Sequence, residues 1–139
     1  MKVLIVCSGN SDRISPFVQD QAKSLEKNGL TIDYFLIKGK GVLGYLKNLS
    51  MLKKHISLCN PDLIHAHYGL SGLLAVMQRK IPVITTFHGD DINVRKNVKY
   101  SYLAARLSKT NIFVHQDLPR KIRYYKKFIH ITPCGVDLE

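Results

Sequence analysis

Residues 62–92 of the chain read DLIHAHYGLSGLLAVMQRKIPVITTFHGDDI, and this stretch decides the fold. A short apolar run is followed by a stretch rich in Leu and Ala, and then by a second apolar run that starts after Pro82. The two runs have the length of buried strands, and the stretch between them has the length of a helix. The unit therefore predicts two parallel strands, because parallel strands need a long crossover connection.

The same alternation runs through all 139 residues, a length that suits one domain with a single core. We expect strands at residues 2–7, 30–37, 62–67, 82–87, 111–115 and 128–132. We expect helices at residues 16–28, 42–58, 69–79, 98–108 and 119–126, the first capped by Ser15 and ending before Gly29. The pattern predicts an α/β fold, a Rossmann-like parallel sheet of about six strands with helices on both faces.

The composition excludes several classes of protein. Apolar residues make up 45% of the chain, so it is neither disordered nor fibrous, and its longest apolar stretches are much shorter than a membrane span. The first residues lack the features of a signal peptide. The three cysteines, Cys7, Cys59 and Cys134, are widely spaced, which argues against a disulfide framework or a zinc site and predicts a cytoplasmic protein.

The charge is strongly positive, with 21 Lys and Arg against 10 Asp and Glu and a formal net charge of +11. Residues 34–61 and 92–116 contain no acidic residue. Such a field attracts polyanions, including nucleic acids, anionic lipid headgroups and phosphorylated ligands. Because the chain lacks an aromatic stacking pattern and a nucleic-acid-binding motif, we expect no nucleic-acid partner.

The predicted helix at residues 42–58 is amphipathic, with lysines around an apolar face. One interpretation is a helix that faces the core and exposes a basic back to water. The other is a membrane-facing surface, in which Lys40, Lys47 and neighbouring apolar residues rest on an anionic inner leaflet. In that case the protein is peripheral at the inner face of the membrane.

The loop after the first strand, residues 7–13, allows an independent enzymatic interpretation. Its single glycine excludes a dinucleotide fingerprint, and the chain contains no Walker loop. Cys7 and Arg13 stand in a Cys-x5-Arg relation, which resembles the phosphate loop of low-molecular-weight tyrosine phosphatases. That chemistry needs a thiol of lowered pKa and an arginine on the phosphate. The chain lacks the Asp-Pro pair that supplies that family's acid, and a small phosphatase stays the alternative function.

Three motifs at the ends of predicted strands occur in order: DLIHAH at residues 62–67, TFHG at residues 86–89 and PCGVD at residues 133–137. The ordered set resembles family 4 retaining glycosyltransferases of the GT-B fold. These enzymes carry a D-[IL]-[IV]-H-x-H block, a T-x-H-[GD] block and a P-x-G-V-D hinge. The resemblance implies one half of a GT-B enzyme. Residues 1–132 would form the N-terminal acceptor-side domain and residues 133–139 the start of the interdomain hinge, with the C-terminal donor-binding domain absent.

The resemblance also implies a function. The full-length protein is expected to be a hexosyltransferase of polysaccharide biosynthesis, which moves a sugar from a nucleotide-diphosphate sugar to a glycan or lipid-linked acceptor. The chain alone is expected to bind acceptor weakly and to be inactive. Its expected partners are the missing donor domain, the acceptor and an anionic membrane surface. No cofactor is expected in this part of the protein.

The same motifs imply roles for individual residues. His88 matches the family histidine that contacts the donor sugar near the reacting centre, and it is the expected catalytic residue. His65 is a second histidine that we expect to face the cleft. No metal ion is expected at the histidines, because the family motifs explain their spacing. The expected substrate-binding residues are Gly9, Asn10, His67, Tyr68, Gly89, Asp90, Asp91 and Asn93.

Overall fold

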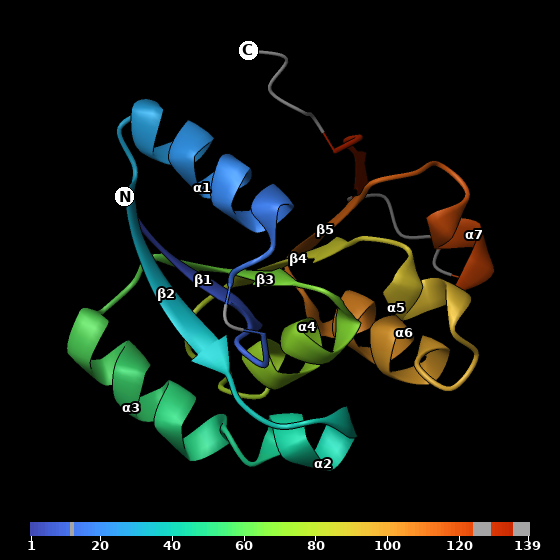
Figure 1. Cartoon of the computed structure of the whole chain (residues 1–139), viewed down its shortest axis with the longest axis horizontal. Helices are drawn as coiled ribbons and strands as arrows, with labels where there is room; N and C mark the ends of the chain where they lie inside the picture. Colours follow the sequence, from blue (N-terminus) through green and yellow to red (C-terminus); the bar gives the residue numbers. More distant parts are fainter. Residues whose placement is uncertain (12, 124–128, 135–139) are drawn as a thin grey trace.

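The computed structural model describes residues 1–11, 13–123 and 129–134. Within them, six strands form one parallel sheet in the order β2-β1-β3-β4-β5-β6 (Figure 1). The predicted α/β fold with a parallel sheet of about six strands is confirmed. The strands are β1 (Lys2–Ser8), β2 (Thr31–Ile37), β3 (Leu63–His67), β4 (Val83–Phe87), β5 (Thr110–Phe113) and β6 (Ile129–Ile131).

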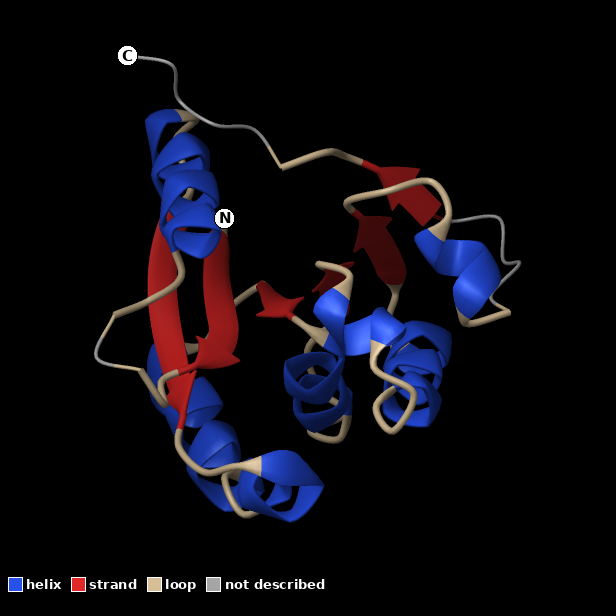
Figure 2. Cartoon of the chain, turned by 45° about the vertical axis from the view of Figure 1, so that its right-hand side comes forward, coloured by secondary structure: helices blue, strands red, loops and turns tan. Residues whose placement is uncertain are grey.

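Helices cover both faces of the sheet, as predicted, but they divide unequally. Among the described residues, α1 (Pro16–Lys27) lies alone on one face, while α3 (Leu49–Cys59), α4 (Gly69–Val76) and α6 (Val98–Leu107) lie on the other (Figure 2). The reason is the strand order. The chain moves one way from β1 to β2 and the opposite way from β2 onward, and right-handed crossovers then place the first helix opposite the later ones.

The core follows the alternation of side chains along β1. Val3, Ile5 and Cys7 face α1, whereas Leu4 and Val6 face α3 and α4. A third cluster fills the space under α6 and contains the stacked rings of Phe87 and Phe113, whose centroids lie 5.0 Å apart. The sheet is thus buried on both faces in its first half.

The helix predicted at residues 42–58 is in fact two helices, α2 (Gly41–Leu46) and α3, with a break before Leu49. Asn48 lies at the break and is buried. Its Nδ2 donates to the carbonyl oxygens of Lys38 and Gly44, both at 2.8 Å, and its Oδ1 accepts from the backbone N of Lys38. The apolar spacing continues across the break, and so the sequence pattern did not reveal it.

Smaller differences concern helix ends. α1 begins at Pro16 as predicted, but within the described residues the Ser15 hydroxyl makes no capping hydrogen bond, and the Ser15 carbonyl accepts from Val18 and Gln19 instead. A short helix, α5 (Asp90–Asn93), occupies a segment expected to be a loop, and α7 (Leu118–Lys121) opens the predicted basic helix. Parts of three predictions lie outside the described residues: residues 124–126 of that predicted helix, residue 128 of the last predicted strand and residues 135–137 of the predicted hinge.

No helix in the described part of the chain combines the length and the apolar character that crossing a membrane requires.

Candidate functional site

The strand order reverses between β1 and β3, and this reversal places a crevice at the carboxyl ends of the two strands. Ser8 ends β1, His67 ends β3 and His88 follows β4, so all three residues lie at this edge of the sheet. Each of the strand-end motifs found in the sequence therefore contributes to one region. The topology, and no single motif, brings them together.

Two histidines of β3 point to the face covered by α1. Ile64 and Ala66 belong to the core on the opposite face, so His65 and His67 alternate to the α1 side. His65 is buried, its Nε2 lies 2.7 Å from Oγ1 of Thr86, and its ring stacks on that of His67 with centroids 4.5 Å apart. Burial lowers the pKa of His65 to about 4, so this imidazole is neutral near pH 7.

His67 and His88 form a directly bonded imidazole pair. Nδ1 of His67 lies 3.1 Å from Nε2 of His88. Burial lowers the pKa of His67 well below its usual value, and burial also lowers that of His88, which the Asp90 carboxylate partly offsets. Both rings are therefore neutral, and one nitrogen donates its proton to the other. Nε2 of His67 is buried and has no hydrogen-bond partner among the described residues.

Tyr68 joins β3 to α4 in an unusual conformation. Its φ of +73° lies in the left-handed region, a conformation that costs a non-glycine residue about 1–3 kcal/mol. Its backbone N donates to the carbonyl of Thr86, and its ring packs on His88 with centroids 4.5 Å apart. The next residue, Gly69, has no room for a side chain, because a Cβ there would collide with Oγ of Ser101. The turn after β3 is thus held tightly against both β4 and α6.

Asp91 ties this turn to the one after β4. Its Oδ2 accepts from the backbone N of Gly69 at 2.9 Å, and its Oδ1 accepts from the backbone N of Gly89 at 3.0 Å. The side chain is buried, and burial raises its pKa to about 6 although the backbone hydrogen bonds act in the opposite direction. Both oxygens are engaged inside the protein, so Asp91 acts as a positioning residue for the two loops.

Of the other residues predicted after β4, two are accessible and Gly89 is buried. Asp90 and Asn93 are exposed, and Oδ1 of Asn93 accepts from Nζ of Lys121 at 2.7 Å. Gly89 has a φ of +109°, which favours glycine and allows the chain to turn from β4 into α5. Asp90 therefore presents the free carboxylate of this loop, whereas its neighbour Asp91 is buried.

The loop after β1 is bound to the loop after β2. Asn10 donates from Nδ2 to the carbonyl of Gly39 at 2.6 Å and accepts on Oδ1 from the backbone N of Gly39 at 2.8 Å. The carbonyl of Gly9 accepts from Nζ of Lys38, and a Cβ at Gly9 would lie 2.7 Å from Cβ of Leu36. The side-chain amide of Asn10 and the carbonyl of Gly9 are thus already engaged with the loop after β2. Substrate contacts of these two residues stay a prediction.

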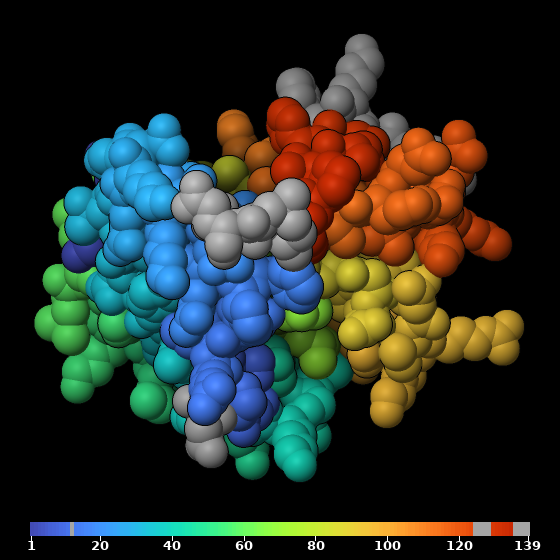
Figure 3. Space-filling view, turned by 45° about the horizontal axis from the view of Figure 1, so that its top comes forward, coloured from blue at the N-terminus to red at the C-terminus, as the bar shows by residue number. Residues whose placement is uncertain are grey.

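Two cavities flank the histidines. One, of about 460 Å³, lies between α1 and the ends of β4 and β5, and the other, of about 450 Å³, lies between the β1 loop and the first turn of α1. His88 lines the first cavity and Tyr68 the second, so the contact between these two rings separates them. On the face that carries α1, the surface of α1 (blue) adjoins that of the chain around β6 (red) (Figure 3).

The structure contradicts the phosphatase interpretation. Cys7 lies in β1 and is 3% exposed, packed under α1. Burial raises the pKa of its thiol to about 11, whereas a phosphatase nucleophile needs a lowered pKa. Arg13 is exposed and lines the second cavity. Cys7 is therefore a core residue.

Two features of this region were not predicted from the sequence. Cys134 lies in the first cavity with its Sγ 3.9 Å from Nδ1 of His88, and it comes from the predicted hinge motif. Three hydroxyl groups, those of Ser8, Ser11 and Ser15, gather around the second cavity. Isolated serines carry no sequence signal for such a cluster.

The predicted membrane-facing residues Lys40 and Lys47 are both exposed and lie at the two ends of α2.

Solved structures share this fold. Sucrose-phosphate synthase from Thermosynechococcus elongatus superposes with a TM-score of 0.78 at 15% identity, over 99% of this chain and 48% of that chain. A second, shorter chain of that enzyme superposes with a TM-score of 0.76, and the match covers 91% of it. Anabaena HepE in complex with UDP gives a TM-score of 0.65 at 13% identity, over 99% of this chain and 45% of that one. UDP-GlcNAc 2-epimerase from Neisseria meningitidis, bound to UDP-GlcNAc, gives 0.67 at 15% identity, over 94% and 45%.

The solved structures show the fold of the chain, and the family model shows its family. The chain spans about half the length of the HepE and epimerase chains and of the longer synthase chain, and identities this low show the fold alone. A comparison with curated proteins finds no match. The family model described as Glycosyltransferase Family 4 matches residues 2–139. Because that match covers nearly every residue, the chain belongs to glycosyltransferase family 4.

Proposed function

We propose that this chain is the acceptor-side half of a retaining glycosyltransferase that transfers a hexose from a nucleotide-diphosphate sugar to a glycan or lipid-linked acceptor. Residues 1–132 form its N-terminal domain, and the segment from residue 133 leads into a donor-binding domain. The match over about half of the solved GT-B chains supports this division. The whole enzyme acts at the cytoplasmic side of a membrane in polysaccharide biosynthesis.

The neutral histidine pair carries the proposal. His67 holds Nε2 of His88, while Nδ1 of His88 lies 3.9 Å from Sγ of Cys134, and both residues line the first cavity. A neutral imidazole fixed in this way can hydrogen-bond a sugar hydroxyl or a polar group of the donor near the reacting carbon. The pair adds no charge of its own, so it suits a positively charged transition state at the sugar better than an imidazolium would.

The surroundings of the pair suit a sugar and its leaving group. Asp90 offers a carboxylate that can accept hydrogen bonds from sugar hydroxyls, and Asn93 offers an amide. The hydroxyls around the second cavity and the first turn of α1 suit the diphosphate of the donor, because a helix N-terminus favours anions. Gly9 and Asn10 lie between Ser8 and Ser11, two residues that line that cavity. Tyr68 packs between the two cavities against His88, and Gly89 follows His88 in the chain.

The proposal is tested by sugar transfer from a panel of nucleotide-diphosphate sugars. The chain extended by its reading frame into the second domain is expected to transfer sugar, and the 139-residue chain alone is expected to transfer none. In the extended protein, Asp90→Asn should raise KM for the acceptor, while Asp62→Asn, which changes an exposed carboxylate just before the amino end of β3, should leave it unchanged. Transfer by the 139-residue chain alone would contradict the division between the two domains.

We also propose that α2 and α3 rest on an anionic membrane. Leu43, Met51 and Leu58 are 76%, 64% and 78% exposed, which is unusual for large apolar side chains. Lys40 and Lys47 lie three and four residues from Leu43, and the same spacing places them on its side of α2. Since residues 34–61 contain no acidic group, this surface combines apolar anchors with positive charge alone.

Vesicle sedimentation tests the membrane surface. The chain is expected to bind vesicles that contain phosphatidylglycerol and to bind neutral phosphatidylcholine vesicles much less. Each lysine near a charged bilayer contributes about 1 kcal/mol, so Lys40→Gln with Lys47→Gln should weaken binding about 30-fold. The matched control, Lys80→Gln with Lys109→Gln, removes two exposed lysines elsewhere and should have a smaller effect. Equal binding to both kinds of vesicle, or equal losses in the two double variants, would remove the membrane from the proposal.

A further inference from the structure

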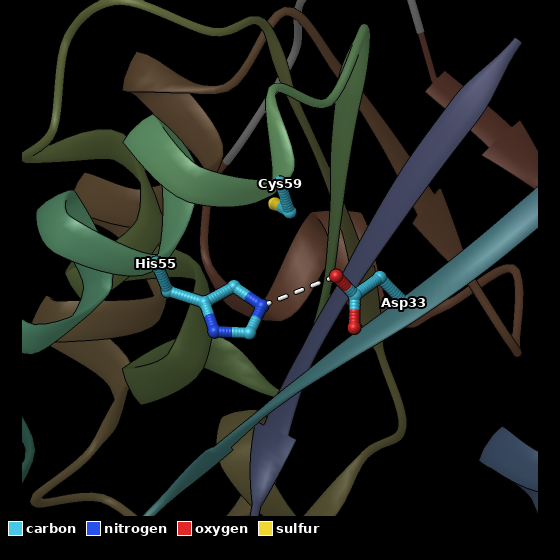
Figure 4. A group of neighbouring side chains, drawn as sticks. All are labelled: Asp33, His55 and Cys59. Carbon is cyan, nitrogen blue, oxygen red and sulfur yellow. Dashed lines mark ion pairs between the residues drawn. The ribbon is translucent and has the colours of Figure 1, made fainter.

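Three metal-ligating side chains of different chemistry meet at the opposite end of the sheet from the crevice. Asp33 comes from β2, and His55 and Cys59 come from α3 (Figure 4). One ligand atom from each, a carboxylate oxygen, an imidazole nitrogen and the thiol sulfur, lies within 4.8 Å of the other two. His55 and Cys59 are four residues apart on one side of the helix, and β2 supplies the third group from across the layer.

The geometry resembles a tetrahedral metal site. Nε2 of His55 lies 3.3 Å from Oδ2 of Asp33. Two ligands at about 2.0–2.1 Å from a tetrahedral zinc ion are about 3.3 Å apart, which is the same separation. The contact does not have the geometry of a hydrogen bond, and Nε2, although buried, has no hydrogen-bond partner among the residues that the structure describes. A buried nitrogen that makes no hydrogen bond and lies beside both a carboxylate and a thiol is the feature that points to a metal ion.

We propose that Asp33, His55 and Cys59 bind a divalent transition-metal ion of the zinc class, with water in the fourth position. Thiolate, imidazole and carboxylate are the three ligand types that zinc takes in proteins. Cys59 is also the last residue of α3, and the negative end of the helix dipole favours a cation there. The ion joins α3 to β2, the edge strand of the sheet, and so acts on the stability of that edge.

Two other interpretations of the cluster fit less well. A nucleophilic cysteine needs a lowered pKa, whereas burial and the Asp33 carboxylate raise that of Cys59. The second interpretation is an ion-pair network, in which Lys2 and His55 lie 4.0 and 3.3 Å from Oδ2 of Asp33. These side chains are about one-third exposed, so such pairs contribute little to stability, and the network gives no role to the thiol. Lys2 opposes a bound cation only weakly, because its long side chain can turn into water.

Cobalt titration of the chain tests the site. Co²⁺ reports tetrahedral geometry by strong visible absorption, and a thiolate ligand adds a charge-transfer band in the near ultraviolet. We expect one Co²⁺ per chain with both features, displacement by Zn²⁺, and a higher melting temperature with either ion. Cys59→Ser should abolish the charge-transfer band, and each of Cys59→Ser and His55→Gln should lower the affinity at least about tenfold, the smallest loss seen even for groups that only support a ligand.

Matched controls separate this site from the other cysteines and histidines. Cys134→Ser and His130→Gln replace exposed residues elsewhere and should leave the spectrum and the affinity unchanged. Circular dichroism of every variant shows whether it folds, and Asp33→Asn provides a third independent ligand change. The absence of saturable binding, a weak octahedral spectrum, or a charge-transfer band that survives in Cys59→Ser would each overturn the proposal. Because no nucleotide or sugar is present, none of these outcomes depends on the proposed transferase function.

Discussion

The molecule holds a cluster of three histidines at one end of its sheet and a cluster with a single histidine at the other, and the two are built differently. At the carboxyl ends of β3 and β4, His65, His67 and His88 contact one another, and burial keeps them neutral. At the amino end of β2, His55 meets a carboxylate and a thiol, and its side chain is 33% exposed. The first cluster is uncharged, and we propose that it contacts a sugar. The second brings unlike ligand groups around a nitrogen that makes no hydrogen bond, and we propose that it binds a cation.

The largest effect is expected at the carboxyl-end cluster. In the two-domain enzyme, His88→Gln should lower kcat for sugar transfer about 10²- to 10³-fold, the usual cost of removing one group that stabilises a transition state. The measurement is steady-state transfer, with thermal melting to show that the fold is kept. His130→Gln, which changes an exposed histidine on β6, serves as control. If both variants kept wild-type kcat, the crevice histidine would lose its catalytic role.

The second effect concerns the free energy of unfolding at acidic pH. The unfolded chain protonates His65 near its usual pKa of 6.5, whereas the folded protein resists protonation down to about 4, so the free energy of unfolding falls as the pH drops through this range. The difference corresponds to about 3 kcal/mol. His67 acts in the same direction. Asp91, whose folded pKa is raised to about 6, acts in the opposite direction and offsets part of the loss.

Urea unfolding between pH 4 and pH 7 measures this dependence. His65→Gln removes one titrating group and should flatten the curve, leaving His67, His88 and Asp91 to set the remaining slope. His130→Gln should keep the wild-type curve, because that residue is exposed. An unchanged slope in His65→Gln would mean that the buried imidazole does not control acid stability.

The third effect separates two adjacent carboxylates. Asp91→Asn leaves the backbone N of Gly69 or Gly89 without an acceptor, so the free energy of unfolding should fall by about 1–3 kcal/mol. Asp90→Asn, the exposed neighbour, should change stability by less than about 0.5 kcal/mol. Denaturant unfolding of the two variants provides the comparison. Equal losses of stability would show that Asp91 does not hold the two loops.

The smallest effect concerns the amino-end cluster. Lys2→Met removes the ammonium group 4.0 Å from Asp33 and should strengthen Co²⁺ binding by up to about fivefold, since half-exposed ion pairs contribute about 0.2–1 kcal/mol. Lys23→Met, an exposed lysine on α1, is the control. The measurement is the same cobalt titration. Weaker binding in Lys2→Met would mean that Lys2 supports the cluster and does not compete with the ion.

How much of the site could be predicted follows from where each residue lies in the chain. His67 and His88 each end a short apolar run, and parallel strands bring such ends to one edge, so their meeting could be expected from sequence. The exposure of Asp90 and the burial of Asp91 could not be predicted, because the turn after β4 decides which way each of these adjacent side chains points. Asn48 broke a helix that its apolar spacing had predicted as continuous. The cluster of Asp33 with His55 and Cys59 was also missed, since it spans a strand and a helix 22 residues apart.

The sequence by itself determined the alternation of strands and helices, the parallel sheet and the strand-end motifs of glycosyltransferase family 4, because these depend on local periodicity and on short runs of residues. Only the tertiary structure decided which faces are covered, which carboxylate is buried, that Cys7 is a core thiol, and that a carboxylate, an imidazole and a thiol meet at the far end of the sheet. Those outcomes depend on strand order and crossover handedness. Both are properties of how distant segments pack, and no single segment encodes them.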